Sequence, residues 1–240
     1  MTQRTWVIVG ATSIIAEEFA HLVAGAGHAL RLVGRDSDQL ELIAKDIKLR
    51  HHVPCETLFF DSTKQPEYIV TPANLGEGEF DLFIALSDST DNAHLNNQSI
   101  TQLIGVNVLV TTLLIHAYLN THQTQHHLLY LSSVAACRGR AKNSLYGASK
   151  AAIEIYLEGL QQAASQHQHI TIAKLGFIDT KQTYGVSGIF YAAPPAACAK
   201  ACLHAMNRKR RRCYYPSFWR AIMAIITRLP FFIYKKMRSI

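Results

Sequence analysis

The chain has 240 residues, 49% of them hydrophobic and 17% charged, which is enough for one domain with a sizeable core. The formal net charge is +7, and the excess of basic residues lies in the last quarter of the chain. No secretory signal is evident and the five cysteines are scattered without metal-ligand spacing, so we expect a cytoplasmic protein with reduced thiols and no metal site.

Short apolar segments alternate with amphipathic ones along most of the chain. Strands are predicted over residues 5–9, 29–33, 55–60, 80–86, 127–131, 170–175 and 213–215, and helices over residues 14–26, 37–50, 99–120, 144–165 and 194–207. This alternation indicates βαβ units and a parallel sheet with helices on both faces. We therefore predict an α/β fold over residues 1–215: one Rossmann-type doubly wound sheet of about seven strands in the order 3-2-1-4-5-6-7.

Tyr146 and Lys150 are spaced by one helical turn, and Ser133 precedes the tyrosine by thirteen residues. A free phenol has a pKa near ~10 and is a poor acid or base at neutral pH. A nearby ammonium group lowers that pKa, and a serine hydroxyl beside the tyrosine can hydrogen-bond a substrate carbonyl oxygen. The spacing alone also fits an amphipathic helix with a half-buried tyrosine and a solvated lysine.

The first predicted strand, turn and helix form the place where a doubly wound fold binds a nucleotide. Helix N-terminal amides favour a pyrophosphate there. Only Gly10 remains of the usual glycine-rich turn, because Ile14 and Ala16 stand where later glycines are expected. Either Thr12 or Ser13 is a candidate for a further hydroxyl contact.

Arg35 follows the second predicted strand, at the position where enzymes that use NAD usually carry an acid. A guanidinium suits a 2′-phosphate by charge and by bidentate geometry, so this residue favours NADP(H). The alternative is a solvated arginine paired with Asp36 or Asp38. Asp61, after the third strand, is a candidate acceptor for the adenine amino group, or else a cap of the following turn.

Taken together, these motifs resemble the short-chain dehydrogenase/reductase family over about residues 5–215. The resemblance rests on V-G-A-T-S-I-I-A at 9–16, G-R-D at 34–36, Asp61, Asn107 in G-V-N-V, L-S-S-V at 131–134, Y-G-A-S-K at 146–150 and L-G-F-I-D-T at 175–180. It departs from the family at Ile14 and Ala16, at residues 85–88, which replace an N-N-A-G element, and at Leu175, which replaces a proline.

The resemblance implies a catalytic set of Asn107, Ser133, Tyr146 and Lys150. In that set the tyrosine is the general acid, the serine positions the carbonyl, the lysine holds the nicotinamide ribose and lowers the tyrosine pKa, and the asparagine holds a water. The implied cofactor-binding residues are Gly10, Thr12, Ser13, Ile14, Ile15, Arg35, Asp61, Ala85, Tyr146, Lys150, Gly176, Ile178 and Thr180. Substrate contacts are expected from residues 87–97, 135–145 and 181–195.

The last part of the chain is basic and apolar. Residues 180–240 hold twelve of the 24 Lys and Arg and none of the 17 Asp and Glu, so the first 179 residues carry a net charge of −5. The apolar stretches at 221–226 and 229–234 are too short for a transmembrane helix of ~20 residues. Residues 216–240 fit either a membrane surface or a contact within a homo-oligomer. Nucleic-acid binding has no supporting motif.

The chain start and this ending also resemble, more loosely, a bacterial subgroup that includes a reductase of polyprenyl-phosphate-linked keto-sugars. We therefore expect an NADP(H)-dependent oxidoreductase that reduces a small-molecule carbonyl substrate, a ketone or keto-sugar, with lipid linkage as one option. The alternative is a dinucleotide-sensing scaffold that binds a membrane or a partner without turnover. The basic ending allows a peripheral position on the inner face of a membrane.

Overall fold

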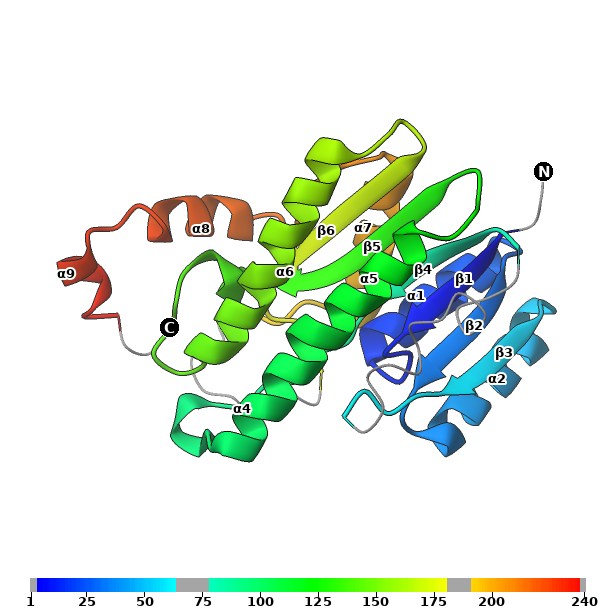
Figure 1. Ribbon diagram of the computed structural model, residues 1–240, viewed down its shortest axis with the longest axis horizontal. Helices are drawn as coiled ribbons and strands as arrows, with labels where there is room; N and C mark the ends of the chain where they lie inside the picture. Colours follow the sequence, from blue (N-terminus) through cyan, green and yellow to red (C-terminus); the bar gives the residue numbers. More distant parts are fainter. Residues whose placement is uncertain (1–3, 64–77, 181–190, 238–240) are drawn as a thin grey trace.

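A computed structural model describes residues 4–63, 78–180 and 191–237, and its centre is a seven-stranded parallel sheet (Figure 1). The strands follow the order β3-β2-β1-β4-β5-β6-β7, which confirms the predicted fold class and strand order. Their bounds are β1 Thr5–Val9, β2 Ala29–Gly34, β3 Cys55–Phe59, β4 Phe80–Ile84, β5 His126–Ser133, β6 Gln168–Leu175 and β7 Arg212–Tyr215. The strands β5 and β6 are longer than predicted because polar residues at both ends of β5 and at the start of β6 still pair in register.

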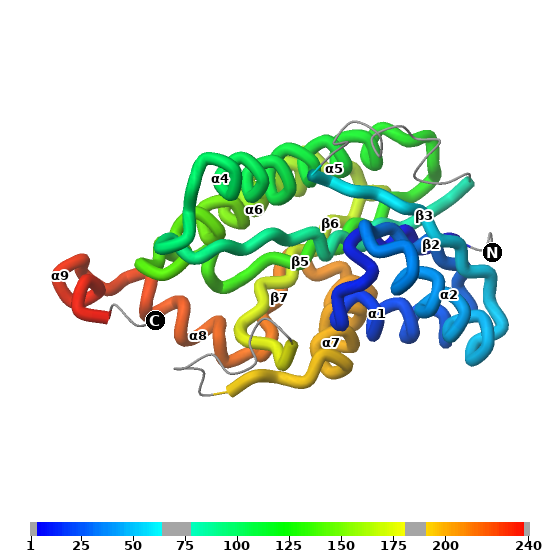
Figure 2. The backbone as a smooth tube through the Cα atoms, turned by 90° about the horizontal axis from the view of Figure 1, so that it is seen from below, coloured from blue at the N-terminus to red at the C-terminus, as the bar shows by residue number. Residues whose placement is uncertain are grey.

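Helices cover both faces of the sheet, as Figure 2 shows. One face carries α1 (Ile14–Gly25), α2 (Ser37–His51) and α7 (Pro195–Asn207), and the other carries α4 (Asn97–Ile104), α5 (Thr111–Leu119) and α6 (Ser144–Ala163). Short helical turns lie at η2 (Asn92–His94), η3 (Gly105–Val110) and η4 (Val134–Cys137). Two further helices, α8 (Trp219–Ile226) and α9 (Phe231–Tyr234), follow the last strand.

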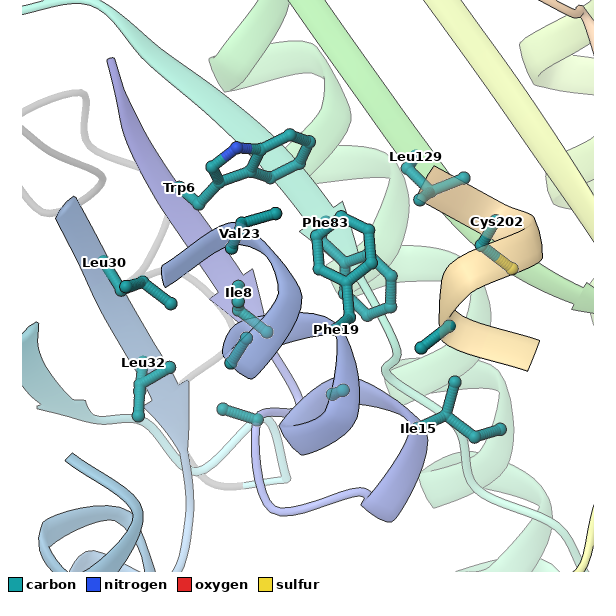
Figure 3. Packing of buried hydrophobic residues seen from close by; sticks show 14 of the residues in the cluster. Trp6, Ile8, Ile15, Phe19, Val23, Leu30, Leu32, Phe83, Leu129 and Cys202 are labelled. Atoms are coloured by element: carbon teal, nitrogen blue, oxygen red, sulfur yellow. The ribbon is translucent and has the colours of Figure 1, made fainter. Parts of the chain in front are cut away.

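Aromatic packing fixes α1 against the sheet (Figure 3). The ring of Phe19 stacks on Phe83 of β4 at 4.3 Å and meets Trp6 of β1 edge-on at 5.0 Å between centroids. All three side chains are buried, and burial of such a side chain stabilises the fold by about 1.5–3 kcal/mol. The start of α1, where a nucleotide is expected, is therefore anchored to two central strands.

The predicted long helix at 99–120 is continuous but not uniform. The chain runs from α4 through a π-helical turn, η3, into α5. Among the described residues this is the one helix, Asn97–Leu119, that is long and apolar enough by length and composition to cross a membrane. Its buried residues Val110, Leu114 and Ile115 pack in the core against the sheet, an arrangement that core helices share.

Candidate active site

The turn between β1 and α1 approaches the end of β4 closely. Gly10 has a φ of +80°, and a Cβ added there would lie 3.0 Å from the backbone C and O atoms of Ala85. The Gly10 and Ala11 amides both donate to the carbonyl of Val33, which ties the turn to β2. Glycine is required here on both grounds, since a positive φ and this close contact disfavour any larger residue.

The N-terminus of α1 is suited to an anion. Ser13 stands at the N-cap in an extended conformation, and its side chain makes no capping hydrogen bond. The first amides of a helix lack partners within the helix and carry the positive end of its dipole. Ile14 is partly exposed beside this end, whereas Ile15 is buried in the core. These residues therefore fit a dinucleotide pyrophosphate, although the usual glycines are missing.

Arg35 lies at the surface directly after β2. Asp36 does not pair with it, because the Asp36 carboxylate caps α2 by accepting from the Gln39 amide at 3.0 Å. Among the described residues the Arg35 guanidinium has no ion pair, so it is available to a phosphate group. Asp61 accepts from both the amide and the hydroxyl of Thr63, at 3.0 and 2.6 Å. Asp61 therefore caps the turn that follows it, and this role is independent of any hydrogen bond to adenine.

Asn107 is fully buried in the π-helical turn η3. Its Oδ1 accepts from the Asp88 amide at 2.7 Å, and its Nδ2 donates to the Asp88 carbonyl at 2.8 Å. The same Nδ2 donates to the hydroxyl of Ser149 on α6 at 2.9 Å, and Ser149 donates to the carbonyl of Tyr146. Asn107 thus joins the loop after β4 to the helix that carries the tyrosine. Single π-turns are frequent at functional sites.

Tyr146 lies beside the hydroxyls of Ser133 and Ser87. Burial raises the pKa of Tyr146 above its ordinary value, while hydrogen bonds from Ser133 and Ser87 and the positive charge of Arg140 act to lower it. The Ser133 Oγ also accepts from the Ala135 amide at 3.1 Å, which fixes its position at the end of β5. The serine and tyrosine that were predicted to act together are therefore adjacent.

Lys150 is buried one turn further along α6. Its Nζ donates to the carbonyls of Leu86 and Leu131, at 3.0 and 3.2 Å, and lies 5.0 Å from the centre of the Tyr130 ring. Burial lowers the pKa of Lys150 to about 7, and the charge of Glu154 opposes that shift. The alternative of a solvated lysine is therefore wrong.

The segment after β6, which was expected to contact the cofactor, packs against the C-terminal part of the chain. Gly176 donates its amide to the carbonyl of Tyr215 at 2.8 Å, and a Cβ added to Gly176 would lie 1.9 Å from Nε1 of Trp219. Ile178 is buried and forms a bridge with Ala193. Thr180 is half-buried at the edge of the described part of this segment.

Two of the three expected substrate segments lie in contact. Asn92 donates its amide and its Nδ2 to the carbonyls of Lys142 and Ala141, at 2.7 and 2.8 Å, and accepts from the Ser144 amide. These bonds join the loop after β4 to the loop before α6. Most of the third segment, residues 181–190, lies outside the described residues.

Sequence reasoning missed two groups beside the tyrosine as functional residues. Both were included only as members of the segments expected to contact substrate, Ser87 in residues 87–97 and Arg140 in residues 135–145. Both act on the pKa of Tyr146 in the folded chain. The available signal was their position, because each follows a parallel strand at the carboxyl edge where such sites form.

Two glycines of α6 provide a test of this packing. A Cβ added to Gly147 would lie 2.6 Å from the Ala135 carbonyl oxygen, whereas nothing lies within 4 Å of one added to Gly159. Gly159→Ala is expected to raise the free energy of unfolding by about 0.5–1 kcal/mol. Gly147→Ala is expected to lower it by about 1–3 kcal/mol through overpacking. Urea unfolding measures both, and equal stabilisation by the two variants would contradict the close approach of α6 to η4.

The comparisons with known proteins bear on this arrangement. A sequence model of the short chain dehydrogenase family matches residues 4–187. The chain belongs to this family. It is similar to an uncharacterized oxidoreductase of Staphylococcus saprophyticus, with 26% identity over 211 residues that cover 84% of this chain and 90% of the relative. An uncharacterized oxidoreductase of Mycobacterium tuberculosis is 27% identical over 242 residues, which cover 96% of each chain.

Solved structures share the fold at lower identity. A 7β-hydroxysteroid dehydrogenase has a TM-score of 0.86 and 18% identity, with 99% of this chain and 97% of that one covered. A short-chain dehydrogenase from Sphingobium yanoikuyae, solved with NADPH, has a TM-score of 0.78 and 21% identity, with coverages of 95% and 96%. This short-chain dehydrogenase is accordingly an oxidoreductase of a family that uses a nicotinamide dinucleotide.

Proposed function

We propose that this short-chain dehydrogenase is an NADP(H)-dependent carbonyl reductase that converts a ketone or keto-sugar to an alcohol. The observation that carries the proposal is the hydrogen-bonded cluster of Tyr146 with Ser133 and Ser87, with the buried Lys150 one turn further along α6. Asn107 supports it from the neighbouring helix through Ser149. A tyrosine that hydrogen-bonds to two hydroxyl groups and lies near the positive charge of Arg140 is suited to proton transfer.

The chain's own residues have distinct roles in the proposed reaction. A bound reduced nicotinamide supplies the hydride that goes to the carbonyl carbon. Ser133 positions the substrate carbonyl oxygen, and Tyr146 donates a proton to that oxygen. Arg140 favours the tyrosinate left after proton donation, because its positive charge lowers the pKa of Tyr146. Lys150 is proposed to hold the nicotinamide ribose, and Asn107 to hold a water that returns the proton.

The preference for NADP(H) is proposed from Arg35, which is exposed after β2 and has no acidic partner among the described residues. The remaining cofactor contacts are proposed at the residues that the family resemblance implies. Two neighbours of similar fold support the same choice, since the proteins from Sphingobium yanoikuyae and Agrobacterium tumefaciens were solved with NADPH and NADP respectively.

Arg35→Asp is expected to weaken NADPH binding by roughly 10–100-fold and not to weaken NADH binding, because an acid at this position can hold the ribose 2′-hydroxyl of NADH. The reason is that a hydrogen bond to a charged group contributes about 1.5–3 kcal/mol, and 1.4 kcal/mol corresponds to a tenfold change. Calorimetric titration with each cofactor measures the two constants. Lys45→Asp, the same charge change at an exposed position of α2, is the control and should alter neither. Equal losses for both cofactors would remove the assigned role of Arg35.

Turnover is tested separately from binding. The purified chain is first titrated with NADPH and NADH, and NADPH oxidation is then followed with a panel of ketones and keto-sugars. Micromolar NADPH binding together with oxidation on at least one substrate supports the reductase. Binding without any oxidation across the panel would favour the sensor alternative, and absence of binding would contradict both.

A further inference from the structure

The far end of the molecule carries three consecutive apolar side chains in contact with solvent. Phe231, Phe232 and Ile233 of α9 are 71%, 70% and 41% exposed. Figures 1 and 2 both place α9 at the extremity opposite the N-terminus, beyond α8. An exposed phenylalanine pair is unusual on a monomer surface, and such clusters with polar surroundings mark interaction sites.

Basic residues flank these side chains. Arg228 precedes α9, Lys235 and Lys236 follow it, and Arg220 lies on α8, and all four are exposed. No ion pair among the described residues involves any of them, and the sequence has no acidic residue after Asp179. The exposed apolar residues and the four cations together are called the basic tip. Its charge complements an anionic surface.

The basic tip is held in place by contacts on its inner side. The Arg138 guanidinium lies 3.9 Å from the centre of the Tyr234 ring and donates to the carbonyl of Ile226. The Tyr234 hydroxyl donates to the carbonyl of Gly139 at 2.6 Å. Because Tyr234 faces the body of the protein, the neighbouring residues of α9 face outward.

The helix α8 connects the basic tip to the candidate active site. Trp219, Met223 and Ile226 lie on one face of α8 and pack on Val134, the residue after Ser133. The opposite face of α8 exposes Ile225. A helix with one face buried in the protein and the other apolar and basic is suited to lying along a membrane interface.

We propose that the basic tip binds the anionic headgroups of a lipid bilayer, with Phe231 and Phe232 inserted among the acyl chains. A second copy of the chain is the weaker occupant on grounds of area. The three exposed apolar residues of the short helix α9 offer far less surface area than the roughly 800 Å² per partner that a specific protein interface buries. Membrane binding needs no such area, because the aromatic side chains insert only shallowly into the bilayer and the four cations are attracted to its anionic headgroups.

Membrane binding would hold the candidate active site beside the lipid surface, since the loop at 134–140 both carries the tip and leads to Tyr146. An amphiphilic carbonyl substrate, with its reactive group at the headgroup level, fits this position. That consequence rests on the proposed function. The lipid binding itself does not, because it is measured without cofactor or substrate.

Flotation of the full chain with vesicles tests the proposal. Binding is expected to vesicles that contain phosphatidylglycerol and to be at least tenfold weaker with pure phosphatidylcholine. Lys235→Gln with Lys236→Gln is expected to weaken binding by roughly 25-fold, since each cation near an anionic surface contributes about fivefold. Added salt should weaken it further, because it screens these charges.

A triple variant separates the contribution of apolar insertion to membrane binding from that of the positive charges. Phe231→Ser, Phe232→Ser and Ile233→Ser together are expected to abolish flotation while circular dichroism stays unchanged, because the three side chains are exposed. The control is Leu42→Ser with Leu49→Ser, which removes leucines that are 67% and 75% exposed on α2. That variant should float as the wild type does.

Three results would overturn the proposal. One is a folded wild-type chain that does not float with phosphatidylglycerol vesicles at low salt. Another is flotation that the triple variant leaves intact. The third is a dimer in sedimentation that the triple variant dissociates, in the absence of vesicle binding, because the tip would then be a contact between copies.

Discussion

Tyr146→Phe is expected to lower turnover by about 10²–10⁴-fold while NADPH binding stays within a few-fold of the wild type. The substitution removes the hydroxyl that Ser133 and Ser87 contact and leaves the ring in place. Burial raises the pKa of Tyr146, and the hydrogen bonds from Ser133 and Ser87 and the charge of Arg140 oppose that shift. The measurement is NADPH oxidation with any active ketone, paired with calorimetry.

Tyr156→Phe is the matched control, since Tyr156 lies on the same helix α6 and is partly buried away from the cluster. Its turnover should stay near the wild-type value. Normal turnover by Tyr146→Phe would remove the tyrosine as general acid and, with it, the proposed mechanism. Loss of both turnover and cofactor binding would instead indicate that the substitution disturbs α6.

Lys174→Met is expected to lower the free energy of unfolding by about 3–5 kcal/mol, because it leaves a buried carboxylate unpaired. Lys174 of β6 and Glu154 of α6 form a 2.6 Å ion pair with side chains only 7% and 8% exposed. The Ser132 hydroxyl donates to the same carboxylate at 2.5 Å, and Lys174 also contacts the Cys137 thiol at 3.3 Å. Denaturant unfolding at neutral pH measures the loss.

Two further variants test whether the loss of stability in Lys174→Met comes from the buried charge. Glu154→Leu combined with Lys174→Met is expected to recover most of the stability, because neither charge of the ion pair is left buried without its partner. Arg31→Met, which breaks a pair with the largely exposed Glu56, should cost less than about 1 kcal/mol. A double variant as unstable as Lys174→Met alone would contradict the buried-charge explanation.

The pH dependence follows from the sign of the lysine shift. Burial alone would lower the pKa of Lys174, but the hydrogen bond and charge of Glu154 outweigh burial and raise the pKa. Stability from this pair is therefore fully present below the ordinary lysine pKa and is lost as pH rises through the raised one. The difference between wild type and Lys174→Met should accordingly shrink in strongly alkaline buffer.

Much of the fold was predictable because its signals are local. Apolar runs such as residues 5–9 and 80–84 are buried on both faces, and helical periodicity separates them, so the parallel sheet followed from the pattern. The family followed from the resemblance of the motifs. The long helix was predicted as uniform, and its π-turn at η3 was not. Asn107 lies in that turn and bonds to the backbone of a distant loop, and periodicity carries no signal for such a bond.

The sequence by itself determined the doubly wound sheet, the family, and the spacing of Tyr146 and Lys150 on one helix face. Only the tertiary structure decided what surrounds them: Ser87 and Arg140 beside the tyrosine, and the carbonyls that hold the lysine. It also decided that the basic tip faces outward, through the contact between Arg138 and Tyr234. The physical reason is distance along the chain, because local preferences depend on near neighbours, whereas burial, pKa and hydrogen-bond partners depend on residues that only folding brings together.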